Sequence, residues 1–461
     1  MKENFRSEKD SIGSVDVPKD ALWGAQTQRS IQNFSIGDEI VPIKLIYAIT
    51  LIKKAGAIAN FNLGLLDKSK EELIVEISSE ILSGMYDDHF PLKIWQTGSG
   101  THTNMNVNEV IANIAAIKTN SIIGKHYPLH PNDDVNKSQS TNDTFPAAIH
   151  ISVVEEIHKQ LIPAINELKE EFDNKSKEWS KIIKIGRTHF QDAVPMSLGQ
   201  ELSGWSKQLE DANVSILSCT HKLFDLPLGG TAVGTGINCP SGFSEEAIRV
   251  INKETNYNFI KSENHYSLMA SHHRLANLMG QLKNLAGSLF KISNDIKILS
   301  SGPRAGIYEL LIPQNEPGSS IMPGKINPTQ CEALAMICTQ IMGLEYAVSI
   351  ANCSGTLQMN EYKPVIGFNI LKSINLLSGG ISNFKNKLVA GMTPNKKSIK
   401  MNLENSLMLV TALVPEIGYE KAAEIANLAF KESLTLKEAT LQLGYLNTEK
   451  LNEILKIDNM I

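Results

Sequence analysis

Residues 316–332 read Glu-Pro-Gly-Ser-Ser-Ile-Met-Pro-Gly-Lys-Ile-Asn-Pro-Thr-Gln-Cys-Glu, and a long apolar run, residues 333–351, follows them. The two Pro-Gly pairs rule out a regular helix or strand, so this segment is predicted to be a loop. The loop ends in a helix start, with Asn327 as N-cap, Pro328 at the first helical position and Gln330 placed as in a capping box. The sequence therefore predicts a glycine-flanked loop at the N-terminus of a long helix.

The loop carries groups that suit an anion. Two adjacent hydroxyls (Ser319 and Ser320), a cation (Lys325) and an amide (Asn327) lie where free backbone N–H groups and the helix dipole favour negative charge. A Gly-Ser-Ser tripeptide on its own is usually a mobile surface loop.

Length and composition exclude several classes of protein. The chain has 461 residues, 42% of them hydrophobic, which is enough for two or three cooperating units. Its formal charge of −5, without long runs of one sign, argues against nucleic-acid binding. No uninterrupted apolar segment predicts a membrane span, and the polar N-terminus lacks the pattern of a secretory or transit signal. Five cysteines without a Cys-x-x-Cys pair fit a reducing cytoplasm.

Helical periodicity dominates the pattern of apolar residues. Apolar side chains recur at three- and four-residue steps in residues 43–52, 151–179, 275–299, 333–351 and 364–388. Proline at position 163 predicts a kink or a split in the second of these segments. Long helices, few strand signals and short loops indicate a helix bundle.

The ends of the chain give weaker signals. Residues 10–18 are predicted to hold a short strand or two, and residues 396–461 a small helical unit. The polar, turn-rich residues 23–30 indicate a surface segment by composition alone. The turn at residues 391–395 marks a plausible domain boundary.

The loop string resembles the signature of the fumarase/aspartase superfamily, Gly-Ser-Ser-x-x-Met-Pro-x-Lys-x-Asn, and residues 328–333 look like its class II fumarase branch. The resemblance implies a mainly α fold with an N-terminal domain (1–139), a central domain of long helices (140–395) and a small C-terminal helical domain (396–461). In this family four chains build one twenty-helix core. Each active site of the homotetramer takes residues from three subunits.

Two polar blocks fit this resemblance as sources of neutral donors for a carboxylate. Residues 96–108 break the helical pattern with hydroxyls, amides and two glycines, and fumarases have nearly this string before a helix that begins Asn-Glu-Val, here residues 108–110. By itself the block is an ordinary turn. Residues 140–142 read Ser-Thr-Asn, whereas fumarases commonly have Ser-Ser-Asn. The candidate ligands in the two blocks are Ser99, Gly100, Thr101, Ser140, Thr141 and Asn142.

A third block, residues 186–195, reads Gly-Arg-Thr-His-Phe-Gln-Asp-Ala-Val-Pro. A lone histidine is usually structural or solvated. The string nevertheless resembles the second conserved block of the superfamily, in which the histidine is the acid/base residue. That residue here is His189, and Thr188 beside it is a further donor.

Residues 130–133, His-Pro-Asn-Asp, form a Pro/Asn/Asp turn by their own chemistry. In class II fumarases the matching residues make a secondary carboxylate site, which assigns His130, Pro131, Asn132 and Asp133 to that role. The family usually has a basic residue three positions before the histidine, and here that position is Tyr127.

Other motifs do not indicate a cofactor or a metal. The glycine string at residues 228–236 lacks the Gly-Lys-Ser/Thr ending of a P-loop. There is no His-Glu-x-x-His, and the adjacent His272 and His273 have poor geometry for one ion. We therefore expect neither a metal nor a cofactor.

The resemblance implies reversible addition of water to fumarate, giving (S)-malate, a reaction of the tricarboxylic acid cycle. Removing the C3 proton of malate needs a base, an acid and stabilisation of the extra charge. By analogy with the family, Ser319 is the base, acting as a stabilised alkoxide. His189, tuned by Glu332, is the acid. Lys325 and Asn327 bind carboxylate, and Thr188 and Ser320 add donors.

Two alternatives remain at this point. An aspartate ammonia-lyase shares the fold and the loop, and Thr141 favours it, whereas Gly324 and residues 329–332 favour a fumarase. A non-catalytic structural oligomer would be free to lose Ser319, His189 or Lys325, and all three are present.

Overall fold

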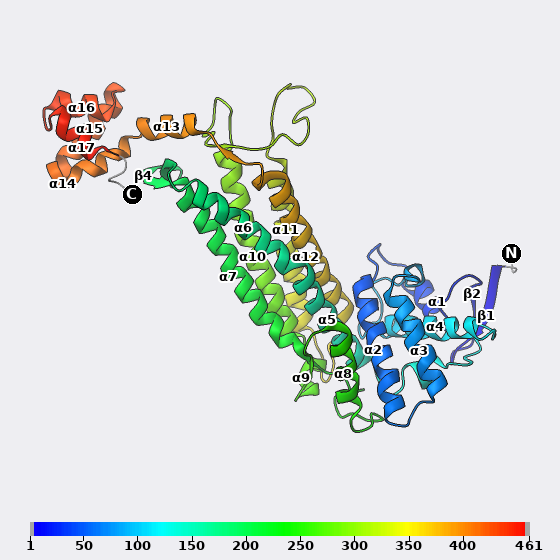
Figure 1. Cartoon of the computed structure of the whole chain (residues 1–461). Helices are drawn as coiled ribbons and strands as arrows, with labels where there is room; N and C mark the ends of the chain where they lie inside the picture. The colour runs from blue at the N-terminus through cyan, green and yellow to red at the C-terminus, as the bar shows by residue number, and fades with distance from the viewer. Residues whose placement is uncertain (1–3, 457–461) are drawn as a thin grey trace. The chain divides into compact units, whose positions relative to one another are not determined.

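The computed structural model describes residues 4–456, and these form two compact units. The first unit combines residues 1–162, 214–284 and 340–377, and the second combines residues 163–213, 285–339 and 378–461. Four long helices contribute residues to both units: α7 (Leu198–His221), α10 (His273–Leu299), α11 (Thr329–Cys353) and α12 (Lys363–Phe384). The mainly α architecture agrees with the prediction from helical periodicity (Figure 1).

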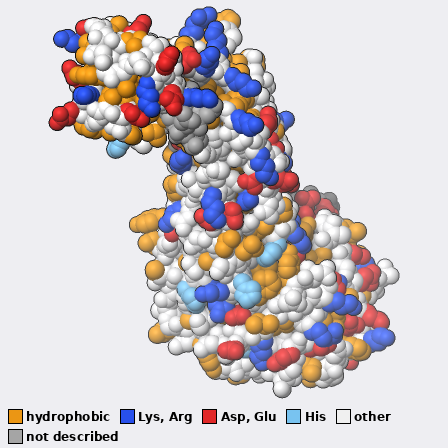
Figure 2. All heavy atoms as spheres, turned by 60° about the vertical axis from the view of Figure 1, so that its left-hand side comes forward, with side chains coloured by type: hydrophobic (Ala, Val, Ile, Leu, Met, Phe, Trp, Pro, Cys, Tyr) orange, Lys and Arg blue, Asp and Glu red, His pale blue; other side chains and the backbone are white. Residues whose placement is uncertain are grey.

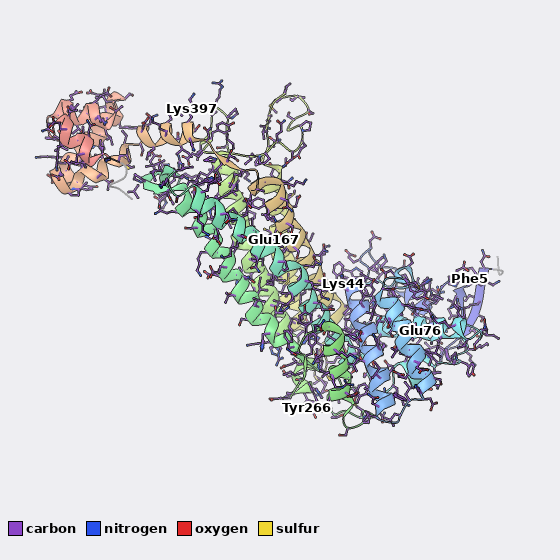
Figure 3. The ribbon with its side chains drawn as sticks, viewed as in Figure 1. Phe5, Lys44, Glu76, Glu167, Tyr266 and Lys397 are labelled. Atoms are coloured by element: carbon purple, nitrogen blue, oxygen red, sulfur yellow. The ribbon has the colours of Figure 1, made fainter. Side chains whose placement is uncertain are left out.

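The first unit is built around α2 (Ile43–Asn62). Residues on every face of this helix are buried, as expected for a helix that is apolar all round. Figure 1 shows α2 beside α3 (Lys68–Leu82) and α4 (Thr101–Lys118), and Glu76 of α3, labelled in Figure 3, accepts from Lys118 of α4 at 2.7 Å. The unit also holds α1 (Ala25–Asn33), α5 (Thr141–Glu156), α8 (Phe243–Thr255), α9 (His265–Ala270) and the strands β1 (Phe5–Lys9), β2 (Ser14–Pro18), β5 (Asp225–Leu226) and β6 (Ile260–Lys261).

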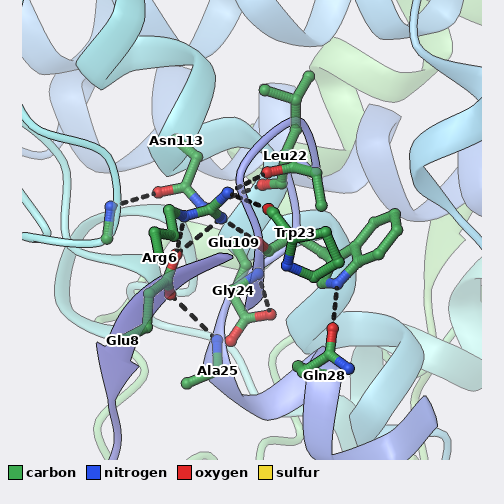
Figure 4. A network of polar contacts seen from close by, with 12 residues as sticks. Arg6, Glu8, Leu22, Trp23, Gly24, Ala25, Gln28, Glu109 and Asn113 are labelled. Carbon is green, nitrogen blue, oxygen red and sulfur yellow. Dashed lines mark hydrogen bonds and ion pairs between the residues drawn. The ribbon is translucent and has the colours of Figure 1, made fainter. Parts of the chain in front are cut away.

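The prediction of a surface segment at residues 23–30 is wrong, because this segment contains α1 and its Thr27, Gln28 and Ser30 are buried. The reason is the Glu109 carboxylate of α4, whose contact with Gly24 is drawn in Figure 4. It accepts from the N–H groups of Gly24, Gln26 and Thr27 at 2.8–3.1 Å and from the Thr27 hydroxyl at 2.6 Å. A carboxylate distant in the sequence thus satisfies the free N–H groups of the first turn.

The prediction that the helical pattern stays broken to residue 108 is also wrong, because α4 begins at Thr101. Gly100 precedes it with a φ of 82°, a left-handed conformation that glycine adopts without strain. From Thr101 onward, the polar residues of this block lie in the helix, and Thr103, Asn104 and Asn106 are buried.

The second unit holds α6 (Ile162–Glu178), the β-hairpin of β3 (Ile183–Thr188) and β4 (Gln191–Ser197), and the C-terminal helices. The predicted split at residue 163 is confirmed, since a π-helical turn, Ile157–Leu161, separates α5 from α6. The ring of Phe172 on α6 packs on Trp205 of α7 with centroids 5.6 Å apart. Lys385, after α12, donates to Glu167 of α6 (labelled in Figure 3) at 2.8 Å.

The C-terminal helices pack against the hairpin. Ile185 of β3 belongs to one buried cluster with Leu403, Leu413, Ile425 and Leu436. The remaining elements of this unit are β7 (Leu310–Leu311), β8 (Thr393–Pro394), α13 (Lys396–Asn405), α14 (Val414–Ile417), α15 (Tyr419–Glu432), α16 (Leu436–Leu443) and α17 (Thr448–Ile454).

Two helices have the length and apolar composition of a membrane span, α11 and the segment Lys363–Val389 that contains α12. Core helices of soluble proteins have the same properties, so this is weak evidence for a membrane location. On the face drawn in Figure 2, acidic and basic side chains are interspersed, with no broad region of one sign.

Candidate active site

In the first unit, the two predicted carboxylate-binding blocks begin neighbouring helices. Gly100 precedes α4, and Ser140 is the N-cap of α5. Gly100 packs so closely on Phe145 of α5 that a Cβ at this position would lie 2.4 Å from the ring. The Ser99 and Thr101 hydroxyls are 2.8 Å apart. Hydroxyls and two helix N-termini thus meet in one region, where partial positive charge favours an anion.

The start of α5 is fixed by a capping box. The Ser140 hydroxyl accepts from Asn142 N at 3.3 Å, and the Asp143 carboxylate accepts from Ser140 N at 3.0 Å. Asp143 also accepts from Gly229 N and Thr231 N, both at 2.9 Å. Burial raises the pKa of Asp143 to about 6 although these hydrogen bonds oppose the shift. The glycine-rich loop therefore braces the 140–142 block.

His189 lies at the tip of the β3–β4 hairpin in the second unit. His189 and Phe190 are the two central residues of the turn, with φ values of 55° and 61°. Two positive φ values fit the twist of a two-residue hairpin, but such turns usually contain asparagine or glycine. Thr188, His189 and Phe190 are all exposed. Left-handed backbone at non-glycine residues is uncommon and concentrates at functional sites.

Behind the tip lies a buried carboxylate that the sequence did not predict. Glu309 is fully buried; it accepts a hydrogen bond from Arg187 at 2.8 Å and forms an ion pair with Lys184 at 3.0 Å. Lys184 also pairs with Glu201 of α7 at 2.7 Å. Burial acts to raise the pKa of Glu309, but the Arg187 hydrogen bond and the two cations outweigh it and lower the pKa. The only sequence signal was a lysine within the apolar residues of β3.

The hairpin tip borders a cavity of about 350 Å³. Its lining includes His189, Phe190, Arg187, Lys291 and Asp295. Lys291 and Asp295 form an ion pair, and Arg187, two residues before His189, pairs with Glu309. The cavity therefore places the imidazole beside cations that are already paired.

In the 316–328 loop, the Ser319 hydroxyl oxygen accepts two backbone N–H groups, from Ile321 at 3.2 Å and Met322 at 3.0 Å. N–H groups aimed at an oxygen stabilise negative charge on it. Gly318 allows this turn, because a Cβ here would lie 1.9 Å from the carbonyl oxygen of Lys325. Ser320 and Lys325 are exposed, and Lys325 lines a separate cavity of about 340 Å³.

The predicted helix start at the end of the loop is displaced by one residue. Helix α11 begins at Thr329, and the Pro328 carbonyl accepts from Glu332 N at 3.1 Å, so Pro328 occupies the N-cap position. The Asn327 amide is not a cap, because it donates to the carbonyl of Gly318. Asn327 thus closes the loop on itself.

The predicted residues fall into three groups. The 99–101 and 140–142 blocks are together in the first unit, and the hairpin and the loop belong to the second unit. His189 and Lys325 line different cavities. Glu332 is exposed in the first turn of α11, and its predicted tuning of His189 stays a prediction.

The predicted secondary site is a π-helical turn, Pro131–Val135. His130 Nδ1 accepts from the N–H groups of Asn132 and Asp133 at 3.2 and 3.1 Å, which leaves Nε2 to face a ligand. Pro131 is buried, whereas Asn132 and Asp133 are exposed. Within residues 4–456, no three histidine, cysteine, aspartate or glutamate side chains gather as metal ligands do.

Comparison with known proteins identifies the family to which the chain belongs. A family model described as lyase matches residues 13–343, and one described as fumarase C C-terminus matches residues 409–461. A relative from Prochlorococcus marinus subsp. pastoris, named class II fumarate hydratase, is 69% identical over 100% of both chains. The chain belongs to the class II fumarate hydratase family. A second relative of that name, from another strain of Prochlorococcus marinus, is 54% identical over 100% of this chain and 99% of its own.

A solved structure agrees with this family. The class II fumarase from Schistosoma mansoni superposes with a TM-score of 0.96 at 42% identity, covering 99% of each chain. The predicted family, the fumarase/aspartase fold and the class of enzyme, a hydro-lyase, are thereby confirmed. The ammonia-lyase alternative is not favoured, so Thr141 is a variation within the class II fumarate hydratase family.

Proposed function

We propose that this chain catalyses the reversible hydration of fumarate to (S)-malate. Family membership supports the reaction, and the two N–H groups directed at the Ser319 oxygen support the choice of base. A serine hydroxyl is too weak a base unless its alkoxide is stabilised, and those donors supply the stabilisation.

In the malate-to-fumarate direction, the Ser319 alkoxide takes the proton from C3. The electron pair of the broken C–H bond forms the double bond as the C2–O bond breaks. His189 donates a proton to the departing hydroxyl, which leaves as water. The exposed imidazole at a strained hairpin tip can reach a substrate without losing a packing contact of its own.

The two carboxylates of the substrate are assigned to different groups. Ser99, Gly100, Thr101, Ser140, Thr141 and Asn142 bind one carboxylate through hydroxyls, amides and the N-termini of α4 and α5. Lys325 and Asn327 bind the carboxylate that takes up the developing charge, with Thr188 and Ser320 as further donors. A cation at that end stabilises the transition state more than the substrate, which is what raises the rate.

A complete site in this proposal takes segments from three subunits of a homotetramer with a twenty-helix core. The support within the chain is α11, whose apolar Met336, Tyr346 and Ile350 are 53–70% exposed in the single chain. An exposed apolar face of this kind needs a partner. Other copies of the chain supply that partner in the cytoplasm, where the tricarboxylic acid cycle consumes and forms malate.

His130, Pro131, Asn132 and Asp133 form a secondary carboxylate site in this proposal. The His130 Nε2 and the Asn132 amide are its donors, and Pro131 packs beneath them. Asp133 lies 3.4 Å from the imidazole and opposes a second negative charge unless the histidine is protonated. We therefore expect this site to bind more weakly than the first.

One assay tests the proposed reaction. The purified protein is incubated with (S)-malate and, separately, with aspartate, and the ultraviolet absorbance of fumarate is followed. We expect fumarate from malate only. Fumarate from aspartate alone would overturn the proposal and support an ammonia-lyase.

A further inference from the structure

Lys53, on α2, is a buried lysine to which the proposed reaction assigns no role, and burial lowers the pKa of its amino group to about 7. Its side chain is fully buried, and its ammonium donates to Asn136 Oδ1 at 2.8 Å and to Gln139 Oε1 at 3.0 Å. Removing an ammonium from water is costly unless its partners are well fixed. Both partners belong to one short segment, residues 136–139.

This segment connects the two candidate carboxylate sites. The segment begins directly after Val135, which ends the turn of the candidate secondary site. It ends beside Ser140, the N-cap of α5. Asn136 Oδ1 also accepts from Asn104 and Asn108 of α4 at 3.1 and 3.3 Å. Lys53 is therefore the cation at the centre of the contacts that join α2, α4 and the segment.

Residues on one face of α2 contact the 136–139 segment along its length. Gly56, one turn after Lys53, has no space for a side chain, since a Cβ would lie 2.7 Å from Gln139 Nε2. Asn60, a further turn along, donates to Lys137 O at 3.1 Å and accepts from the Ser138 hydroxyl at 2.6 Å. Residues at three- and four-residue spacing lie on the same face of a helix, so the three form one stripe.

Lys53 is also coupled electrostatically to the buried carboxylate that braces the start of α5. Asp143 is the carboxylate whose charge acts on Lys53, and it holds Ser140 N, Gly229 N and Thr231 N. Without Lys53, Asn136 and Gln139 would lose the buried donor that they share.

We propose that Lys53 is a positioning residue for the hydration reaction. It holds residues 136–139 against α2 so that the hydroxyls and amide of residues 140–142 face a substrate carboxylate. This inference rests on the proposed function, because it gives those groups a substrate. Lys53 itself does not touch the substrate in this account.

The test compares Lys53→Met with Lys54→Met. Lys54 is the next residue of the same helix and pairs with Glu254 at 2.7 Å, outside the 136–139 segment. For Lys53→Met we expect KM for fumarate to rise about tenfold or more, as for the loss of hydrogen bonds from a charged donor, with a much smaller change in kcat. The reason is that residues 140–142 bind the carboxylate equally in substrate and transition state. Lys54→Met should keep both constants.

Gln139→Met is the milder variant in case Lys53→Met does not fold. It removes one of the two acceptors and should raise KM in the same direction by a smaller factor. Calorimetric binding of succinate, which has both carboxylates and no double bond, should weaken in parallel with KM in the same variants. A folded Lys53→Met or Gln139→Met protein with unchanged KM and unchanged succinate affinity would overturn the inference.

The succinate measurement separates the two proposals. If the wild-type protein does not hydrate fumarate but binds succinate, the proposed reaction fails and the role of Lys53 is still decided by the succinate affinities of the variants. If the wild-type protein hydrates fumarate and the variants are indistinguishable from it, only the role of Lys53 fails. Wild-type protein that does not bind succinate would overturn the inference as well.

Discussion

The groups proposed to bind substrate and the groups proposed to react with it are held in opposite ways. The 99–101 and 140–142 blocks begin buried helices, and buried Asp143 ties the second block to the glycine-rich loop. His189 lies on an exposed hairpin tip, and Ser319 in a largely exposed loop that contacts mainly itself. One region is rigid by burial and the other by local backbone geometry.

This difference indicates a division of roles. The groups proposed to bind carboxylate are fixed before any ligand arrives, because Asp143 holds the start of α5 and Gly100 packs on Phe145. The groups proposed to react, in the second unit, are exposed in the single chain, and the proposed homotetramer would cover them. The following predictions test that contrast.

The largest effect is expected on the exposed side. Ser319→Ala and His189→Asn should each lower kcat by roughly 10²–10⁴-fold, the usual contribution of a placed acid or base. Neither side chain is buried, so the melting temperature and the elution volume on size exclusion should remain those of the wild type. Near-normal turnover in either variant would contradict the assignment of that residue as acid or base.

The hairpin is expected to depend on the buried carboxylate of Glu309. Glu309→Gln leaves Lys184 and Arg187 without their shared carboxylate, and breaking a buried pair costs about 3–5 kcal/mol. Urea unfolding monitored by circular dichroism measures the loss. Glu404→Gln is the matched control, because its partner Lys400 is 3.7 Å away at the surface, where such a pair contributes about 0–1 kcal/mol. Equal effects of the two substitutions would show that the hairpin does not need this carboxylate.

On the buried side, Gly100→Ala should both destabilise the protein and impair binding. It adds left-handed strain at a φ of 82° and a Cβ 2.4 Å from the Phe145 ring, together about 1–3 kcal/mol. KM for fumarate should rise because the residue lies between Ser99 and Thr101. Gly64→Ala, with a φ of 74° and open space around it, isolates the strain alone. Gly64→Ala should keep the wild-type KM. If Gly100→Ala also kept it, the 99–101 block would not be a binding segment.

The smallest effect concerns protonation of the buried anchors. Burial raises the pKa of Glu109 from 4.5 to about 7, against the hydrogen bonds from α1. Between these values the folded chain holds a proton that the unfolded chain has released, so stability falls as pH rises. The slope is about 1 kcal/mol per pH unit.

Thermal unfolding of wild type and Glu109→Gln between pH 4.5 and 7 tests this. The stability advantage of the wild type should shrink toward pH 7. A constant difference across the range would mean that Glu109 stays ionised and that charge, not a neutral acid, caps α1.

The sequence predicted the long helices and the split at Pro163, because both follow from local periodicity and local stereochemistry. It missed α1, whose polar residues are buried only because Glu109, far along the chain, caps the helix. It missed the hairpin, since His189 and Phe190 are not residues that usually mark such a turn. Glu309 and Lys53 were missed for the same reason, because their partners are set by tertiary structure. The motifs were found by resemblance, and their separation between two units was not visible in any of them.

The left-handed backbone at His189 and Phe190 has a consequence for anyone selecting heat-tolerant versions of this enzyme. Replacing Phe190 by glycine relieves strain of about 1 kcal/mol and would be enriched by a screen for thermal survival. The same replacement makes the backbone beside His189 more flexible. Variants selected for heat tolerance would therefore have a lower kcat. Position 190 is where that compromise should first become visible.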